Sequence, residues 1–259
     1  MSEQIIDSSR ALRGTAAGVL AVLGSICAIA AGMIQWRQDI PRGDALDVLA
    51  YVEGRPWFLA AYLGIIGMIC WAVALSTAGR ALADPHARAL ARMVDPIMFV
   101  GVAVFSVDYA HDGVTTGVLA GQWADGDRTA AQAQAAYQVV EGLVGGTTML
   151  AHVLIGSALT GYAVALLRSR QFSPTLCWFG IVLSFGWFAG GSALFLRLPG
   201  AGFEFLLPFT SAVTIWLAVL GTMLLRNASR GVSQSAAFSA LPPVRRGNGR
   251  WRWFWLGGR

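Results

Sequence analysis

The sequence predicts an all-α, polytopic membrane protein that folds as a six-helix transmembrane bundle. Of its 259 residues, 56% are hydrophobic and only 13% are charged, whereas soluble domains carry about 25% charged residues. Apolar runs long enough to cross a hydrocarbon core of about 30 Å occur six times. These runs are too long for the alternating strands of a β-barrel, and helices satisfy every backbone group within lipid. We therefore expect six spanning helices.

The spans follow one another with short connections, and we place them at 14–34, 57–79, 96–119, 142–167, 174–196 and 204–225. Pro56, Pro96 and Pro174 each stand at the first turn of a span, where the missing N–H has no intrahelical partner. The chain then divides into an N-terminal segment at 1–13, the bundle at 14–225 and a basic, aromatic tail at 226–259.

Two connections on one side of the predicted bundle have helical character of their own. Residues 40–56 carry Leu46, Leu49 and Ala50 on one side with acidic residues between them, which predicts a short helix on the outer surface. Residues 122–142 contain turn residues followed by strong helix formers. We therefore expect the fourth span to extend beyond the membrane.

The arginines predict the orientation. All 19 basic residues are Arg; the two termini and the connections on their side carry 14 of them, and the opposite connections carry five (Arg37, Arg42, Arg55, Arg128 and Arg197). The positive-inside rule places both termini in the cytoplasm. We expect a multi-pass protein of a bacterial inner (plasma) membrane. The tail mixes Arg with Trp and Phe, which suits binding to anionic membrane lipid, and we expect no nucleic-acid partner.

The polar stretch "VDYAHDG" interrupts the third apolar run. Asp108, His111 and Asp112 are spaced i, i+3, i+4, which places them on one face of an α-helix. Counting from Pro96, Asp108 lies ~18 Å into the span and His111 ~23 Å. Ionisable side chains at such depth are costly unless they are paired or face a polar cavity. This face is therefore the candidate functional site.

The fourth span contributes further candidates. Counting back from the end of that span at Leu167, His152 lies ~22 Å in, at the same level as His111. Glu141 precedes His152 by about three turns, so it lies on the same face but nearer the outer surface. Glu204, at the outer start of the sixth span, is placed to face the same vestibule. We therefore predict one site formed by Asp108, His111, Asp112, His152 and Glu141.

We favour an enzyme that acts on a lipophilic substrate, a lipid or an isoprenoid, by acid–base or metal-assisted chemistry. A desolvated carboxyl group can protonate an alkene or epoxide while a His–Asp pair removes a proton. With a metal, Asp108 or Asp112 would join the two histidines as three ligands of a catalytic Zn²⁺. No HExxH or HxxxH spacing accompanies them, so the sequence identifies no cofactor.

Three alternatives remain open. The acids and histidines can form the proton relay of a small carrier, in which the glycines of "GLVGG", "GWFAGG" and "GVLAG" permit close helix contacts. The two halves show no detectable internal repeat, whereas many carriers are built from such repeats. This difference disfavours a carrier. His111 and His152 can ligate a b-type haem, although the flanking acids disfavour it. Finally, an Asp–His152 hydrogen bond can be a structural latch with no chemistry.

Several apolar segments resemble those of bacterial six-helix integral membrane proteins of unknown function. The resemblance rests on "RALRGTAAGVLAVLGSICAIAAGMI", "RPWFLAAYLGIIGMICWAVALSTAGRAL" and "FSPTLCWFGIVLSFGWFAGG". It covers most of residues 10–225 as a pattern of apolar runs. It implies a compact six-span bundle and no assigned chemistry. The "DYAHD" cluster departs from the pattern of that family.

Overall fold

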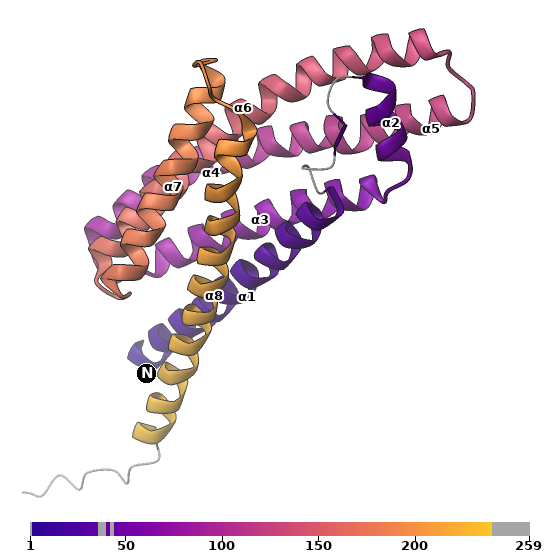
Figure 1. Cartoon of the computed structure of the whole chain (residues 1–259). Helices are drawn as coiled ribbons and strands as arrows, with labels where there is room; N and C mark the ends of the chain where they lie inside the picture. The colour runs from indigo at the N-terminus through magenta and orange to yellow at the C-terminus, as the bar shows by residue number, and fades with distance from the viewer. Residues whose placement is uncertain (1, 36–39, 42–43, 240–259) are drawn as a thin grey trace, which may run out of the picture.

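The computed structural model describes residues 2–35, 40–41 and 44–239, which fold as a bundle of long helices (Figure 1). No strand occurs in those ranges, so the all-α prediction is confirmed. The elements in chain order are α1 (Ser2–Gln35), α2 (Ala45–Glu53), α3 (Trp57–Ala81), α4 (Pro85–Tyr109), the π-helix η2 (Ala110–Thr115), α5 (Thr116–Ala124), α6 (Ala130–Ser169), α7 (Pro174–Phe195) and α8 (Phe203–Ser239).

Within the described residues, six helices are long and apolar enough to cross a membrane, as predicted. They are α1 from Leu12, α3, the continuous helix formed by α4, η2 and α5, then α6, α7 and α8 to Ser229. The predicted tail lies mostly in residues 240–259, outside the described part of the chain. The predicted N-terminal segment is helical from Ser2 and continues directly into the first span.

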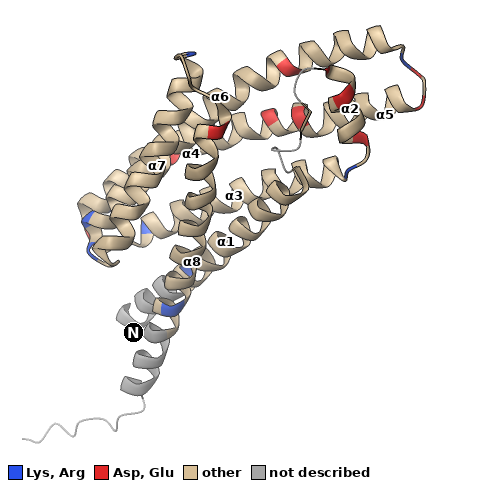
Figure 2. Cartoon of the chain, in the orientation of Figure 1, with Lys and Arg blue, Asp and Glu red and all other residues tan. Residues whose placement is uncertain are grey.

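The bundle has two ends, which we call the terminal end and the far end. At the terminal end, α1 begins, α8 ends, and α3 connects to α4 and α6 to α7 (Figure 1). At the far end lie the connections through α2, between α5 and α6, and between α7 and α8. Helix α1 packs against α3 and α8, while α6 packs against α4 and α7. Arginines gather at the terminal end and acidic side chains mostly towards the far end (Figure 2).

The third span begins eleven residues earlier than the prolines predicted, at Pro85 instead of Pro96. Asp84 caps this start, because its carboxylate accepts hydrogen bonds from the backbone N–H of His86 at 2.7 Å and of Ala87 at 3.1 Å. A capping residue followed by proline at the first helical position is a strong start signal. Pro96 therefore lies inside α4, and the depths counted from it are too small.

A small helical layer, which we call the far cap, covers the far end. It consists of α2, α5 and the first half of α6, packed around the apolar side chains of Leu49, Val52, Trp57, Leu119, Ala120 and Ala133. Helix α6 has 40 residues, a length of about 60 Å, so it extends well beyond the shorter α7 (Figure 1). The predicted short helix and the extension of the fourth span are both present.

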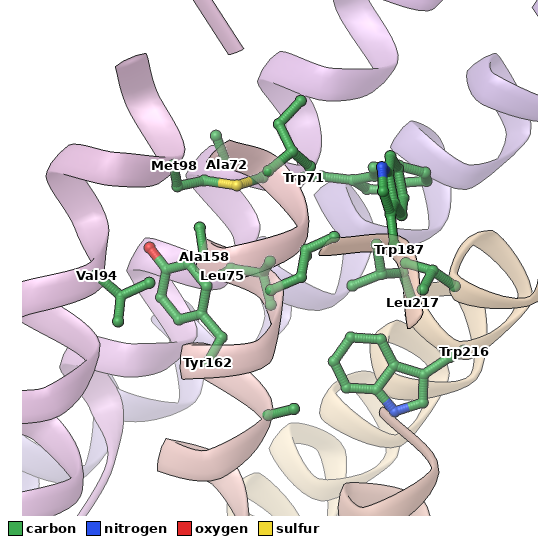
Figure 3. Packing of buried hydrophobic residues seen from close by; sticks show 14 of the residues in the cluster. Trp71, Ala72, Leu75, Val94, Met98, Ala158, Tyr162, Trp187, Trp216 and Leu217 are labelled. Atoms are coloured by element: carbon green, nitrogen blue, oxygen red, sulfur yellow. The ribbon is translucent and has the colours of Figure 1, made fainter. Parts of the chain in front are cut away.

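The main core is formed between the spanning helices. It contains buried side chains from different helices, including Trp71, Met98, Tyr162, Trp187 and Leu217 (Figure 3). Some glycines permit close helix contacts: a Cβ added to Gly156 would lie 2.5 Å from the backbone nitrogen of Phe188. The glycines of "GLVGG" do not have this role, because an added Cβ at any of them meets no atom within 4 Å. Glycine content alone did not distinguish packed from exposed positions.

Candidate functional site

Asp108 is the deepest of the predicted site residues, with a side chain that is 0% exposed. It lies at the end of α4, on the stripe of that helix that packs against α6. The hydroxyl groups of Thr147 and Thr148 both approach its Oδ1, at 3.1 and 2.6 Å. The hydroxyl of Thr148, together with that of Thr147, which is shared with two backbone carbonyls of α6, holds the carboxyl group against α6 in a fixed orientation.

Asp112 contacts a different neighbour. Its Oδ2 accepts from Nε2 of Gln35 at 3.4 Å, and its backbone carbonyl accepts from the indole of Trp57 at 2.8 Å. The amide oxygen Oε1 of Gln35 accepts a hydrogen bond from the hydroxyl of Tyr109 at 3.3 Å. Gln35 is the last residue of α1 and is 1% exposed. Its amide therefore joins α1 to the α4–η2 region at the far end.

The π-helix η2 separates the two aspartates. Asp108 precedes it and Asp112 lies within it, so the spacing of four residues does not have the geometry of an uninterrupted α-helix. The carbonyls of Ala110 and His111 accept from the hydroxyls of Thr115 and Thr116, at 3.4 and 3.2 Å. Asp108 contacts α6 whereas Asp112 contacts α1. Single π-turns inside α-helices occur frequently at functional sites.

His152 lies on α6, one turn after Thr148, and is 9% exposed. Its Nδ1 accepts a hydrogen bond of 2.8 Å from the indole N–H of Trp187 on α7. The ring of Phe203, at the start of α8, meets the imidazole edge-on with 6.1 Å between centroids. An indole nitrogen is only a donor, so Nδ1 carries no proton in this arrangement. His152 is therefore neutral, with its proton on Nε2.

The packing of α7 fixes the depth of this site. A Cβ added to Gly191 would lie 2.9 Å from the Cβ of His152, so these residues are at one level. Gly191 precedes the end of α7 at Phe195 by four residues, or about 6 Å. His152, Thr148 and the carboxyl group of Asp108, which is hydrogen-bonded to Thr148, therefore lie near the far ends of the spans, below the far cap.

The remaining predicted residues are less enclosed. His111 is half-buried on η2, and Glu141 is exposed on the extended part of α6. Glu204 is exposed in the first turn of α8, next to Phe203. In the described part of the chain, no three His, Cys, Asp or Glu side chains are placed to hold one metal ion. The three-ligand zinc set considered from the sequence is therefore not assembled.

Sequence reasoning missed a second buried carboxylate on α4. Asp95 is 9% exposed; it accepts from Ser76 at 3.1 Å and from the hydroxyl of Tyr162, and it pairs with Arg80 at 3.5 Å. The sequence placed Asp95 just outside a span that began at Pro96. The capping signal "DP" at 84–85 was the observation that could have placed it inside a helix.

The helices and their buried polar groups define a class of protein: an integral, multi-pass, all-α membrane protein with lipid-facing apolar surfaces. No family model, curated protein or solved structure matches the chain. The function is therefore inferred from the residues of the site.

Proposed function

We propose that the protein is a small proton-coupled carrier and that Asp108 is the residue that binds the proton. The observation that carries this proposal is the fully buried carboxyl group of Asp108, which is fixed by two hydroxyl groups immediately before the π-helix. Intramembrane carboxyl groups mark proton and substrate pathways. Carrier sites are formed where spanning helices depart from regular α-helical geometry.

Protonation of Asp108 changes the contacts of α4 with α6. The ionised carboxylate accepts strong hydrogen bonds from Thr147 and Thr148, and these weaken when a proton neutralises one oxygen. The adjacent η2 offers a way to move, because converting its π-turn into an α-turn rotates the following helix by about 100°. Proton binding at Asp108 is thereby linked to a rearrangement that includes α5 and the far cap.

The geometry supports a carrier better than the enzyme favoured by the sequence. A catalytic base needs a free lone pair, and Nδ1 of His152 already accepts from Trp187. Asp108 is enclosed on the α6 side, and the side chain of His152, on α6, is packed against Trp187 of α7 and against Phe203. A small solute that enters by helix movement fits such an enclosed polar layer better than a lipid that must reach a base from the bilayer.

In a bacterial inner membrane, the arginine distribution favours an orientation with the terminal end in the cytoplasm. The proton-binding layer at Asp108 then lies near the periplasmic side, under the far cap. Protons from the periplasm have only a short distance to travel to this layer. This is expected for a carrier that is driven by the inward proton gradient.

The carrier is tested by reconstituting the full chain in liposomes that contain a pH-sensitive dye. An imposed pH gradient is followed while amino acids, organic acids, organic cations and inorganic ions are added one at a time. We expect one solute class to accelerate proton movement with the wild type and with Asp127→Asn, an exposed loop control. Asp108→Asn should abolish this acceleration.

The assay contradicts the carrier if no solute moves protons, or if Asp108→Asn couples as well as the wild type. Mass spectrometry of lipids from the same membranes tests the alternative that the protein is an enzyme. A lipid product that forms with the wild type and not with Asp108→Asn would replace the carrier by an enzyme with a lipophilic substrate.

A further inference from the structure

The second buried carboxylate, Asp95, joins three helices near the terminal end. It lies on α4 and contacts Ser76 and Arg80 on α3 and Tyr162 on α6. Arg80 stands in the last turn of α3, and its side chain is 60% exposed, whereas that of Asp95 is 12% exposed. The ion pair therefore lies at the boundary between the bundle interior and the terminal side.

The two carboxylates of α4 enclose an apolar layer. Asp95 and Asp108 are separated by thirteen residues, about 20 Å along the helix. The buried stripe of α4 between them consists of Met98, Gly101, Val102 and Phe105. Side chains of α3 and α6 complete this layer: Trp71, Leu75, Ile155 and Leu159, each no more than 3% exposed. A polar layer therefore lies on each side of the apolar layer.

This arrangement closes the Asp108 layer from the terminal side. A solute or water that enters from the terminal end meets the Arg80–Asp95 pair first and the apolar layer next. The pair is a single contact of 3.5 Å to a mostly exposed guanidinium. Such partly exposed pairs contribute little free energy and are weakened by salt. The ion pair therefore adds little to the packing of α3 on α4 and can open at a small cost in free energy.

We infer that the Arg80–Asp95 pair, with Ser76 and Tyr162, is the terminal-side gate of the carrier. This inference rests on the proposed function, since a gate needs a transported solute. Opening separates the end of α3 from α4 and α6 and admits water to the apolar layer. Asp95 then exchanges its contacts with Arg80 and Ser76 of α3 for water, while the hydroxyl of Tyr162 on α6 keeps its carboxylate in position.

The gate is tested by the accessibility of a buried thiol. Cys27, Cys70 and Cys177, all buried, are replaced by Ala, and Met98→Cys places one thiol a turn beyond Asp95. A charged, membrane-impermeant methanethiosulfonate is added to spheroplasts and, separately, to inverted vesicles. We expect Arg80→Gln to accelerate labelling of the M98C thiol about fivefold, equivalent to about 1 kcal/mol. The acceleration should occur only in the preparation that exposes the terminal end.

Three controls separate a gate from general loosening. Arg92→Gln removes an exposed arginine of α4, the helix that carries Asp95 and Met98, and should leave the labelling rate unchanged. Arg80→Lys keeps the charge and should give an intermediate rate. A thiol at Leu217→Cys, buried in α8, should stay unlabelled with Arg80→Gln. Salt provides a test without substitution at Arg80, because added NaCl should accelerate M98C labelling with Arg80 but not with Gln at this position.

Unchanged M98C labelling in Arg80→Gln and in high salt overturns the gate. Labelling of both buried thiols also overturns it, because the pair would then hold the whole bundle together. These results are independent of the proton-coupling assay. A failure of Asp108→Asn to affect coupling removes the carrier, whereas a failure of the labelling test removes only the gate.

Discussion

The indole N–H of Trp187 donates to Nδ1 of His152 at 2.8 Å, across the contact between α7 and α6. This bond decides which nitrogen of His152 carries the proton. It also joins the polar layer around Asp108 to α7, because Thr148 and His152 are one turn apart on α6.

Trp187→Phe should remove this donor and leave Nδ1 of His152 buried without it. The free energy of unfolding should fall by about 1–3 kcal/mol, the usual cost of such a loss. Thermal unfolding in detergent measures this change, and ¹⁵N NMR of the imidazole reports the tautomer. Trp216→Phe is the control, because the indole of Trp216 donates to the carbonyl of Leu176 at 3.0 Å and not to His152. It should leave the imidazole tautomer unchanged. Protonated Nδ1 in the wild type would contradict the assignment.

Thr148→Val should destabilise the protein through Asp108, because a buried oxygen loses its closest donor at nearly constant side-chain volume. We expect a loss of about 1–3 kcal/mol. Thr147→Val should cost less, since the hydroxyl of Thr147 is shared with the carbonyls of Leu143 and Val144. A double-mutant cycle of Thr148→Val with Asp108→Asn measures the coupling. Additive losses would show that the two side chains do not interact.

His152→Ala tests whether Asp108 and His152 act as one unit, which the sequence predicted and which stays a prediction. If the neutral imidazole donates to the buried carboxyl group, removing one partner should cost about 1–3 kcal/mol or more, and replacing both by apolar residues should cost less. A double variant that keeps both stability and coupled transport identifies a structural latch. One that keeps stability but loses transport places the function at this pair.

Gly156→Ala should strongly destabilise the contact of α6 with α7, because its Cβ would lie 2.5 Å from the backbone nitrogen of Phe188. Backbone atoms cannot move aside as a flexible side chain can. Gly145→Ala is the matched control on the same helix, where an added Cβ meets nothing within 4 Å. It should raise stability by about 0.5–1 kcal/mol through helix propensity. Equal effects at both positions would contradict the packing of α6 on α7.

Asp84 makes the start of α4 sensitive to acid. The backbone N–H of Ala87 lowers the pKa of its carboxyl group, with further contributions from the N–H of His86 and from nearby positive charge. A carboxylate with a lowered folded pKa contributes stability above its ordinary pKa, and this is lost as pH falls through the folded value. The difference in melting temperature between wild type and Asp84→Ala should therefore shrink on acidification. A constant difference down to strongly acidic pH would contradict the capping role.

The number of spans was predictable from local composition alone. About twenty consecutive apolar residues suffice to identify a span, whatever they pack against. The same holds for the short helix α2 and for the presence of polar groups in the third and fourth spans. Asp108 and His152 were identified because charged and imidazole groups are rare in such runs, and that rarity is visible without knowing any contact.

The contacts of these groups were decided only by tertiary structure. The π-helix directs Asp108 to α6 and Asp112 to α1, although regular spacing placed them on one face. Gln35 became a partner of Asp112, and Trp187 a partner of His152, because α1 and α7 bring these side chains beside the polar residues of other helices. Asp95 looked like a residue outside the membrane until the start of α4 was known to be Pro85. Hydropathy is a sum over neighbours in the chain, whereas a hydrogen bond depends on which helices meet and at what rotation.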